Sequence, residues 1–405
     1  MANRTKLHYM ALILTIACSN TALYGLPYLR GQFYDIELAA LSLTNVQLGT
    51  LFCIYGAVAI VAYIFGGVIA DRFPGKAILI TALIISGFLH LYVMTGPSYP
   101  ELCVIFAMMA VTSILMFYPA SVKILTYMSA GDHRGSVLGD YLAMVSVLTI
   151  AVSFVGFAVM RSGEDSRKTF NTLMLVYGLL HFAAVGMILK FYSDDGGETS
   201  RFSFSEVSGI LHDGKMRRVT VLTFTNYMMI CMLTYVIPYL TEICGVNEST
   251  AVIFSIIRVN VLAVAAAPLA GRLCDRIGSA TKVMTYASLI AAILIVGVFA
   301  GCFLPMPIGV TMLLILAATF SIISAKSINA VLLTEIGTPK CYMGTAIGFV
   351  SFFGYSPDAF IYRIGGEAID RYMTAGYAAI FGAFIVTGLI GYIVGIRLLK
   401  MLRCK

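Results

Sequence analysis

Long apolar segments alternate with short polar ones along almost the whole chain of 405 residues. A helix needs about 20 predominantly apolar residues to cross the hydrocarbon core of a bilayer. On that criterion the pattern predicts twelve spanning helices, over residues 7–29, 45–70, 75–95, 100–128, 136–160, 169–191, 217–241, 249–273, 280–301, 306–334, 341–366 and 373–399. We therefore expect an all-α membrane protein with twelve transmembrane helices.

The first apolar segment raises a separate question, because a basic start followed by an apolar run is also typical of a signal peptide. The segment begins MANRTKLHYMALIL and stays apolar as far as Leu29. No small-residue cleavage site ends a short apolar core, as a signal peptide requires. We interpret the segment as the first spanning helix.

One sizeable polar stretch interrupts the pattern at its midpoint. Residues 192–216 read YSDDGGETSRFSFSEVSGILHDGKM. They predict a linker between an N-terminal six-helix bundle over residues 1–191 and a C-terminal six-helix bundle over residues 217–405. The composition agrees with burial in lipid, since 60% of the residues are hydrophobic and only 12% are charged. A soluble domain has about 25% charged residues.

A short charged motif occurs once in each half. Residues 66–76 read GGVIADRFPGK and residues 270–278 read AGRLCDRIG. The shared positions are Gly67, Asp71, Arg72 and Gly75 in the first copy and Gly271, Asp275, Arg276 and Gly278 in the second. The two aspartates are 204 positions apart, about half the chain. A repeat of this length indicates a duplicated helical bundle, which is typical of transporters.

The orientation of the chain follows from its lysines and arginines. With twelve spans both termini lie on one side, and 18 of the 27 basic residues fall in the loops and ends on that side, against six on the other. Cytoplasmic loops carry the excess of basic residues. We expect both termini and the central linker to be cytoplasmic. Topology also accounts for the net charge of +7, so nucleic acid is not an expected partner.

The three remaining basic residues, Lys123, Arg258 and Lys326, lie inside predicted spans. A charge at bilayer depth is costly and is therefore a functional hypothesis by default. Lys123 and Lys326 are 203 positions apart, close to the repeat length, so they are near-equivalents in the two halves. Cations converging at this depth attract an anion. The alternatives are lysines that extend to the headgroups and an arginine held in a structural ion pair.

Two acidic residues of the second half are candidates for the coupling ion. Asp358 follows Pro357 in the eleventh span, and Glu335 ends the tenth, nine residues after Lys326. For each, a structural ion pair is the competing interpretation. Asp140 is a candidate partner for Lys123 on the same grounds.

Several other side chains complete the predicted substrate site. They are Tyr24 on helix one, Asn226 on helix seven, Tyr355 on helix eleven and Arg30 at the outer end of helix one. An ordinary interfacial arginine explains Arg30 equally well. His90 and His181 are interpreted as packing or interfacial residues. The nine cysteines show no paired spacing and no nearby histidines, which predicts small buried side chains without a metal or a disulfide.

The twelve helices, the central linker and the repeated G-x-x-x-D-R motif together resemble the major facilitator superfamily. The segments FYPASVKILTYMSAGDHRGSVLG (117–139) and LLTEIGTPKCYMGTAIGFVSFFGYSPDAF (332–360) resemble a bacterial branch near the organophosphate–anion and nitrate/nitrite transporter-like members. The glycine-rich signature of nitrate porters is not visible. The resemblance implies that helices one, four, seven and ten line a cavity and that the repeated motif controls gating.

These features predict a secondary transporter of the inner membrane that moves a small organic anion by alternating access. A sugar acid, a carboxylate and an organophosphate fit equally well, and we expect proton-coupled uptake by a monomer without a cofactor. No G-x-x-x-x-G-K-[ST] run is present, which argues against an ATP-driven pump. The alternatives are an efflux antiporter for amphipathic compounds and a non-transporting membrane sensor. An integral membrane enzyme is not expected, because no cluster of catalytic residues is visible.

Overall fold

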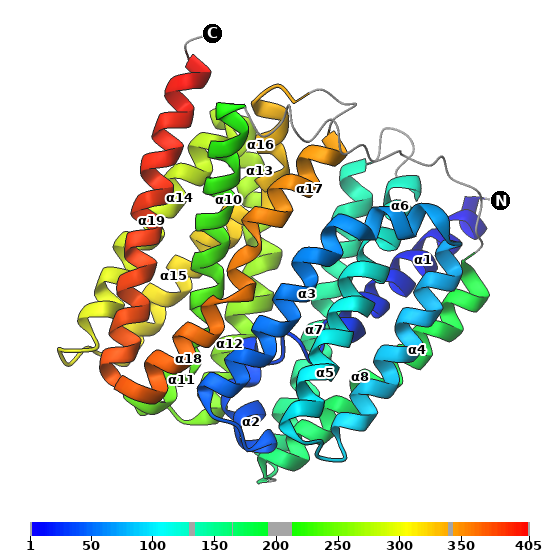
Figure 1. The fold of residues 1–405 in the computed structure, drawn as a ribbon, viewed down its shortest axis with the longest axis horizontal. Coiled ribbons are helices and arrows are strands. Elements are labelled where there is room, and N and C mark those ends of the chain that lie inside the picture. Colours follow the sequence, from blue (N-terminus) through cyan, green and yellow to red (C-terminus); the bar gives the residue numbers. More distant parts are fainter. Residues whose placement is uncertain (1, 129–133, 164, 193–212, 339–342, 404–405) are drawn as a thin grey trace. The chain divides into compact units, whose positions relative to one another are not determined.

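The fold is built from helices throughout the part of the chain that the structure describes (Figure 1). The structure is a computed structural model that describes residues 2–128, 134–163, 165–192, 213–338 and 343–403. Within these ranges ten helices are long and apolar enough to cross a membrane, and a shorter apolar helix covers His8–Leu23. The predicted all-α membrane fold is confirmed.

Contacts divide the chain into two compact units. Unit 1 comprises Met1–Ser42 and Val61–Arg201, and unit 2 comprises Leu43–Ile60 and Phe202–Lys405. One helix, α3 (Asn45–Arg72), begins in unit 2 and ends in unit 1. Most of the predicted linker, residues 193–212, lies outside the described residues.

Unit 1 contains, besides the end of α3, the elements α1 (Ala2–Leu23), α2 (Arg30–Leu41), α4 (Gly75–Val93), α5 (Tyr99–Ala110), η1 (Val111–Phe117), α6 (Tyr118–Met128), α7 (Arg134–Arg161) and α8 (Ser166–Phe191). Helix α1 packs on α7 and α8, and α4 packs on α8. Their shared core is aliphatic and aromatic, with Ile13, Leu79, Phe117 and Ile188 among its buried members.

Unit 2 contains the start of α3 and the elements α10 (Gly214–Met232), η2 (Leu233–Tyr235), α11 (Val236–Pro238), η3 (Tyr239–Ile243), α12 (Glu248–Ile256), η4 (Ile257–Val261), α13 (Leu262–Ile277), α14 (Ala280–Ala300), α15 (Ile308–Ser327), α16 (Asn329–Glu335), α17 (Met343–Gly354), η6 (Ser356–Ala359), α18 (Ile361–Tyr372) and α19 (Thr374–Arg403). Helix α14 packs on α15 and α19, and α10 packs on α17 and α19 (Figure 1).

The first predicted span, 7–29, is wrong at its C-terminal end. Helix α1 stops at Leu23, a series of turns follows, and α2 occupies a segment that we expected to be a loop. The physical cause is Pro27, which has no backbone N–H to continue the helix. The N–H of Leu26 donates instead to Nε2 of His90 at 3.3 Å. His90 is fully buried, so its interfacial interpretation is wrong and its role is to satisfy this break.

The eleventh predicted span, 341–366, is also not one continuous helix. Helix α17 ends at Gly354, the 3-10 turn η6 carries Pro357 and Asp358, and α18 resumes at Ile361. A proline inside a helix removes one hydrogen bond and clashes with the preceding turn. Irregular backbone of this kind is tolerated at membrane depth only where protein or water satisfies it. The break therefore places Asp358 in a segment whose backbone groups need partners from protein or water.

Candidate functional site

The candidate site is centred on the carboxylate of Asp358, whose residue is 5% exposed. The hydroxyl of Tyr227 donates to Oδ2 at 2.8 Å, and the thiol of Cys231 donates to Oδ1 at 3.4 Å. Tyr227 and Cys231 are four residues apart on α10, so one face of that helix presents both donors. A buried carboxylate needs such partners to offset its lost hydration.

A cation lies on the other side of Tyr227. The ammonium Nζ of Lys326, on α15, is 5.6 Å from the centre of the Tyr227 ring, and the charges of Lys326 and Asp358 interact. Tyr355 packs against the same ring, with ring centres 4.6 Å apart. Tyr227 thus joins the predicted coupling acid to the predicted substrate-binding lysine. Lys326 is exposed and Tyr355 is half-buried, whereas Asp358 is buried.

Short contacts hold the elements of this site together. The amide of Asn226 donates to the carbonyl of Ile322 at 3.5 Å and joins α10 to α15. A Cβ on Gly354 would lie 2.6 Å from the Thr223 methyl carbon, so only glycine lets α17 lie this close to α10. Asn226, which the sequence predicts to bind substrate, therefore joins two helices beside the site.

Arg258 lies in the π-helical turn η4 and is 4% exposed. This turn continues directly into α13 and contacts α15, the helix that carries Lys326. π-helical turns are rare in proteins, and those that occur are often found at functional sites. The structure thus brings two of the three predicted cations onto neighbouring elements of unit 2.

The predicted residues of unit 1 have different surroundings. Lys123 is half-buried on α6, and the carboxylate of Asp140 accepts a hydrogen bond from the Tyr9 hydroxyl at 2.9 Å. The hydroxyl of Tyr24 donates to the carbonyl of Ser113 at 3.4 Å. Tyr24 also packs edge-on against Phe117.

Arg30 is buried rather than interfacial, which corrects that alternative. It begins α2, and the same helix carries Glu37, which is 1% exposed. Helix α2 is not one of the described helices that are long and apolar enough to span a membrane. Burial raises the pKa of the Glu37 carboxyl to about 8, and the nearby charge of Arg30 opposes the rise.

Glu335 is the last residue of α16, and its side chain lies against the start of α14. Its carboxylate accepts hydrogen bonds from the Ser279 hydroxyl at 2.5 Å and from the backbone N–H and hydroxyl of Thr281 at 2.8 and 2.9 Å. A negative group at a helix N-terminus satisfies free N–H groups and is favoured by the helix dipole. This geometry describes a helix cap, and a coupling role for Glu335 stays a prediction.

The two copies of the repeated motif are described to different extents. The side chain of Asp71 and the surroundings of Gly67 lie outside what the structure describes, whereas Arg72 is exposed and Gly75 begins α4. In the second copy Asp275 and Arg276 are exposed, and Gly278 ends α13 in the left-handed conformation, φ 70°. A Cβ on Gly271 would meet no heavy atom within 4 Å, so this glycine does not mark a close helix contact.

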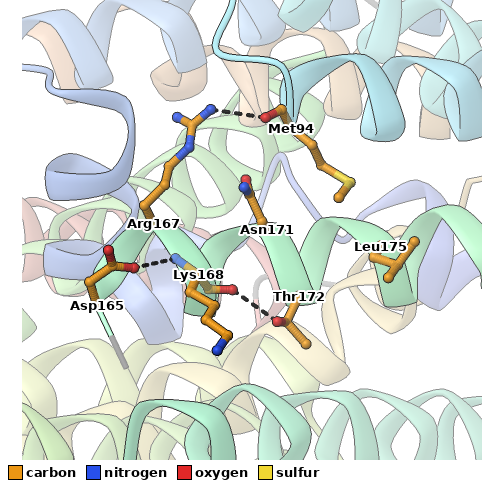
Figure 2. A pocket seen from close by; sticks show the side chains of 7 residues that line it. All are labelled: Met94, Asp165, Arg167, Lys168, Asn171, Thr172 and Leu175. Atoms are coloured by element: carbon orange, nitrogen blue, oxygen red, sulfur yellow. Dashed lines mark hydrogen bonds between the residues drawn. The ribbon is translucent and has the colours of Figure 1, made fainter. Parts of the chain in front are cut away.

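A surface hollow of about 320 Å³ lies in unit 1 and contains none of the predicted site residues. Its lining is Met94, Asp165, Arg167, Lys168, Asn171, Thr172 and Leu175 (Figure 2). The Arg167 guanidinium donates to the carbonyls of Ala40 and Met94 at 2.8 and 3.0 Å. Figure 2 shows this arginine reaching Met94, so it joins the ends of α2 and α4 to α8.

Three features of the structure do not follow from the sequence. Cys231 was interpreted as a small hydrophobic side chain but donates to Asp358. Glu37 follows Arg30 by seven residues in α2, but the helix kinks at Phe33 between them, so helical spacing in the sequence does not pair the two. The two histidines were noticed separately, but their rings pack 4.6 Å apart inside unit 1.

The sequence is similar to known membrane proteins over nearly its full length. The profile of the Major Facilitator Superfamily matches residues 9–362. Inner membrane protein YqcE of Escherichia coli (strain K12) is 26% identical over 369 residues, 88% of this chain and 86% of that protein. Inner membrane protein YihN of the same organism is 24% identical over 407 residues, 98% of this chain and 96% of that protein.

Solved structures share the fold. A D-xylose-proton symporter superposes with a TM-score of 0.76 at 16% identity, covering 97% of both chains. Nucleoside transporter NupG superposes with a TM-score of 0.74 at 13% identity, covering 96% of this chain and 99% of that one. The profile, the fold and the repeated motif agree. The chain therefore belongs to the Major Facilitator Superfamily and is a multi-pass membrane transporter, not an enzyme.

Proposed function

We propose that this transporter takes up a small organic anion together with a proton. The observation that carries the proposal is the cluster in unit 2, where Tyr227 connects the buried carboxylate of Asp358 to the exposed ammonium of Lys326. The substrate class is a sugar acid, a carboxylate or an organophosphate. A likeness in fold to a D-xylose-proton symporter supports proton coupling as a mode that this architecture can carry.

The coupling follows from the charges of the cluster. An ionised Asp358 attracts Lys326 and competes with any anion for its charge. Protonation of Asp358 removes that competitor, so Lys326 then binds an anion more tightly. Linkage makes the effect reciprocal, because an anion at Lys326 favours the protonated form of Asp358 to the same extent. Proton and anion therefore bind together and leave together, which is symport.

The other predicted residues have supporting roles in this proposal. Arg258 adds a second positive charge near α15, and the half-buried Tyr355 packs against the Tyr227 ring that Lys326 approaches. In unit 1, Lys123 and Tyr24 stay proposed contributors, whereas the predicted contribution of Arg30 is not carried further, because this arginine is buried near Glu37. The two bundles, residues 1–191 and 217–405, alternate access, and both repeated motifs bias that exchange from a cytoplasmic side that holds both termini.

Transport by purified protein in proteoliposomes tests the proposal. The probes are glucuronate, lactate and glycerol 3-phosphate, each offered with and without an inward proton gradient. Asp358→Asn, a neutral mimic of the protonated acid, should abolish gradient-driven accumulation but retain exchange of labelled for unlabelled substrate. The matched control is Glu248→Gln, an exposed acid at the start of α12. Undiminished proton-driven accumulation by Asp358→Asn would refute the proposal.

A further inference from the structure

Two of the free cysteines in unit 2 lie at the same end of that unit. Cys244 directly follows η3, at the end of the span Gly214–Ile243, and Cys302 comes two residues after the span Ala280–Ala300. Consecutive spans alternate in direction, so these two, the seventh and the ninth expected from the sequence, end on the same side. Figure 1 shows α11, which precedes η3, at the end of unit 2 opposite the C-terminus. The two thiols therefore lie on one side of the membrane.

The two thiols meet at the hydroxyl of Tyr239, in the last turns of the seventh span. This hydroxyl donates to the carbonyl of Val298 at 3.5 Å, and the Cys302 thiol donates to the same carbonyl at 3.8 Å. The N–H of Cys244 donates to the Tyr239 carbonyl at 3.1 Å, so the two residues are one π-helical turn apart. The Tyr239 hydroxyl interacts with both thiols, and the thiols interact with each other. Packing thus brings together two cysteines that are 58 positions apart in the chain.

Close packing holds the hydroxyl of Tyr239 in place. Tyr239 is fully buried, and its ring packs against Tyr377 and Phe381 of α19, with ring centres 5.7 and 5.0 Å apart. A Cβ on Gly301 would lie 3.1 Å from the Tyr239 hydroxyl oxygen, so glycine leaves room for this oxygen beside the end of α14. Side chains packed at this density keep one arrangement, which fixes the meeting point of the thiols.

The two thiols differ in how easily a reagent reaches them. Cys244 is half-buried, and the next residue, Gly245, is exposed in a left-handed turn with φ 67°. Cys302 is 9% exposed. Thiol–disulfide exchange begins with the attack of a thiolate on another disulfide, and its rate depends on access. Cys244 is therefore placed to attack an external disulfide, and Cys302 is placed to resolve the intermediate.

The compartment decides whether such a pair is oxidised. In the proposed orientation both termini are cytoplasmic, so the two spans end on the periplasmic side. Disulfides form and persist in the bacterial periplasm, whereas cytosolic thiols are kept reduced. The thiol pair of unit 2 thus lies where oxidation is favoured.

We propose that Cys244 and Cys302 are a modification site, at which a disulfide joins the outer ends of the seventh and ninth spans. The oxidant is an external disulfide, supplied in the cell by a thiol–disulfide oxidoreductase. The Cys244 thiol attacks it, forms a mixed disulfide and releases one thiol of the oxidant. The Cys302 thiol then attacks the Cys244 sulfur, forms the Cys244–Cys302 bond and releases the second thiol. Two protein thiols are oxidised, the oxidant is reduced to two thiols, and the two thiol protons pass to these leaving groups.

The bond closes a segment of the chain that contains α12, η4 and α13. Closing a long segment restricts the unfolded chain and so stabilises the folded one. The disulfide therefore stabilises the part of unit 2 that carries Arg258. The inference goes beyond the proposed transport function and uses from it only the orientation of the termini.

Peptide mapping of the purified full chain tests whether the two thiols pair, whatever the orientation. The protein is incubated with glutathione disulfide, its remaining thiols are blocked with N-ethylmaleimide under denaturing conditions, and it is digested without reductant. Mass spectrometry should find the Cys244 peptide joined to the Cys302 peptide, and dithiothreitol should separate them. Cys103, a half-buried thiol of α5, is the internal control and should be blocked or joined to glutathione. Adducts at both Cys244 and Cys302 without a joined peptide would overturn the proposal.

Single variants test the order of attack. In Cys302→Ser, Cys244 should keep the glutathione as a trapped mixed disulfide. In Cys244→Ser, the less accessible Cys302 should react with glutathione disulfide about tenfold more slowly. Equal rates in the two variants would overturn the assignment of Cys244 as the attacking thiol.

Protein taken directly from cells tests the modification as it occurs in the membrane. Cells are quenched with trichloroacetic acid, which stops thiol exchange, before the thiols are blocked and mapped. The parent should show the joined peptide. Purified without reductant, it should melt about 5 °C higher than after reduction, whereas the Tm of Cys244→Ser should not change. Two blocked thiols in the quenched cells would overturn the native disulfide and leave the proposed role of Asp358 unaffected.

Discussion

Each unit contains a buried acid near a basic residue, but the two pairs differ in what can reach them. In unit 2, Asp358 has donors from Tyr227 and Cys231, and its partner Lys326 is exposed. In unit 1, Glu37 and Arg30 are both buried, at 1% and 4% exposure. An accessible cation can exchange its partner for a substrate, and an enclosed one cannot. Under the proposed function, the comparison therefore favours Asp358 and Lys326 for substrate chemistry and a structural role for Glu37 and Arg30.

The largest expected effect is a difference between Lys326 and Lys123, which are near-equivalents in the two halves. Lys326→Gln should lower kcat/KM for anion uptake about 100-fold or more, because a charge-assisted contact to the substrate is lost. Lys123→Gln should change it less than about fivefold. Lys400→Gln, an exposed lysine at the end of α19, is the control in the same uptake assay. Equal losses in the Lys326 and Lys123 variants would show that both halves bind substrate.

The next effect concerns the hydroxyl group of Tyr227, which donates to Asp358 in unit 2. Tyr227→Phe keeps the ring beside Lys326 but removes the hydroxyl that stabilises ionised Asp358. Because the carboxylate loses this hydrogen bond, the pH of half-maximal uptake should shift by about one unit. Tyr24→Phe is the matched control in unit 1. An unchanged pH profile in Tyr227→Phe would contradict Asp358 as the coupling acid.

A smaller effect tests the enclosed pair. Burial raises the pKa of Glu37 to about 8, above its value in the unfolded chain. The stability from the neutral form is therefore complete at low pH and is lost as pH rises toward and through 8. Glu37→Gln should match the parent Tm at pH 5 and exceed it by about 5 °C at pH 9. Parallel melting curves for the two proteins across this range would contradict the assignment.

The smallest effect separates a helix cap from a coupling acid. Glu335→Ala removes the acceptor at the start of α14 and should destabilise the protein by about 1 kcal/mol in thermal unfolding. Gradient-driven accumulation should be unchanged when normalised to folded protein. Loss of proton coupling with wild-type stability would return Glu335 to the coupling role that the sequence suggested.

The sequence predicted the architecture well because span length and the repeated motif are local properties of the chain. It also drew attention to Asp358 and Lys326, since a charge inside an apolar run is visible in one dimension, and the structure places both beside Tyr227. The breaks after Leu23 and Gly354 were harder to place, because proline signals a break without giving its partners. The contribution of Cys231 depends on which face of α10 meets η6, and that is set by packing. The same holds for the meeting of Cys244 and Cys302, which are 58 positions apart.

Counting protons on binding tests the central claim most directly. The heat of binding is measured while purified transporter is titrated with the best substrate of the panel, at a pH where Asp358 is ionised. The titration is made in two buffers of different ionisation enthalpy, because the difference between the two heats gives the number of protons taken up. The account predicts uptake of about one proton per anion bound by the parent protein and none by Asp358→Asn. Anion binding without proton uptake by the parent, or equal uptake by the variant, would contradict it.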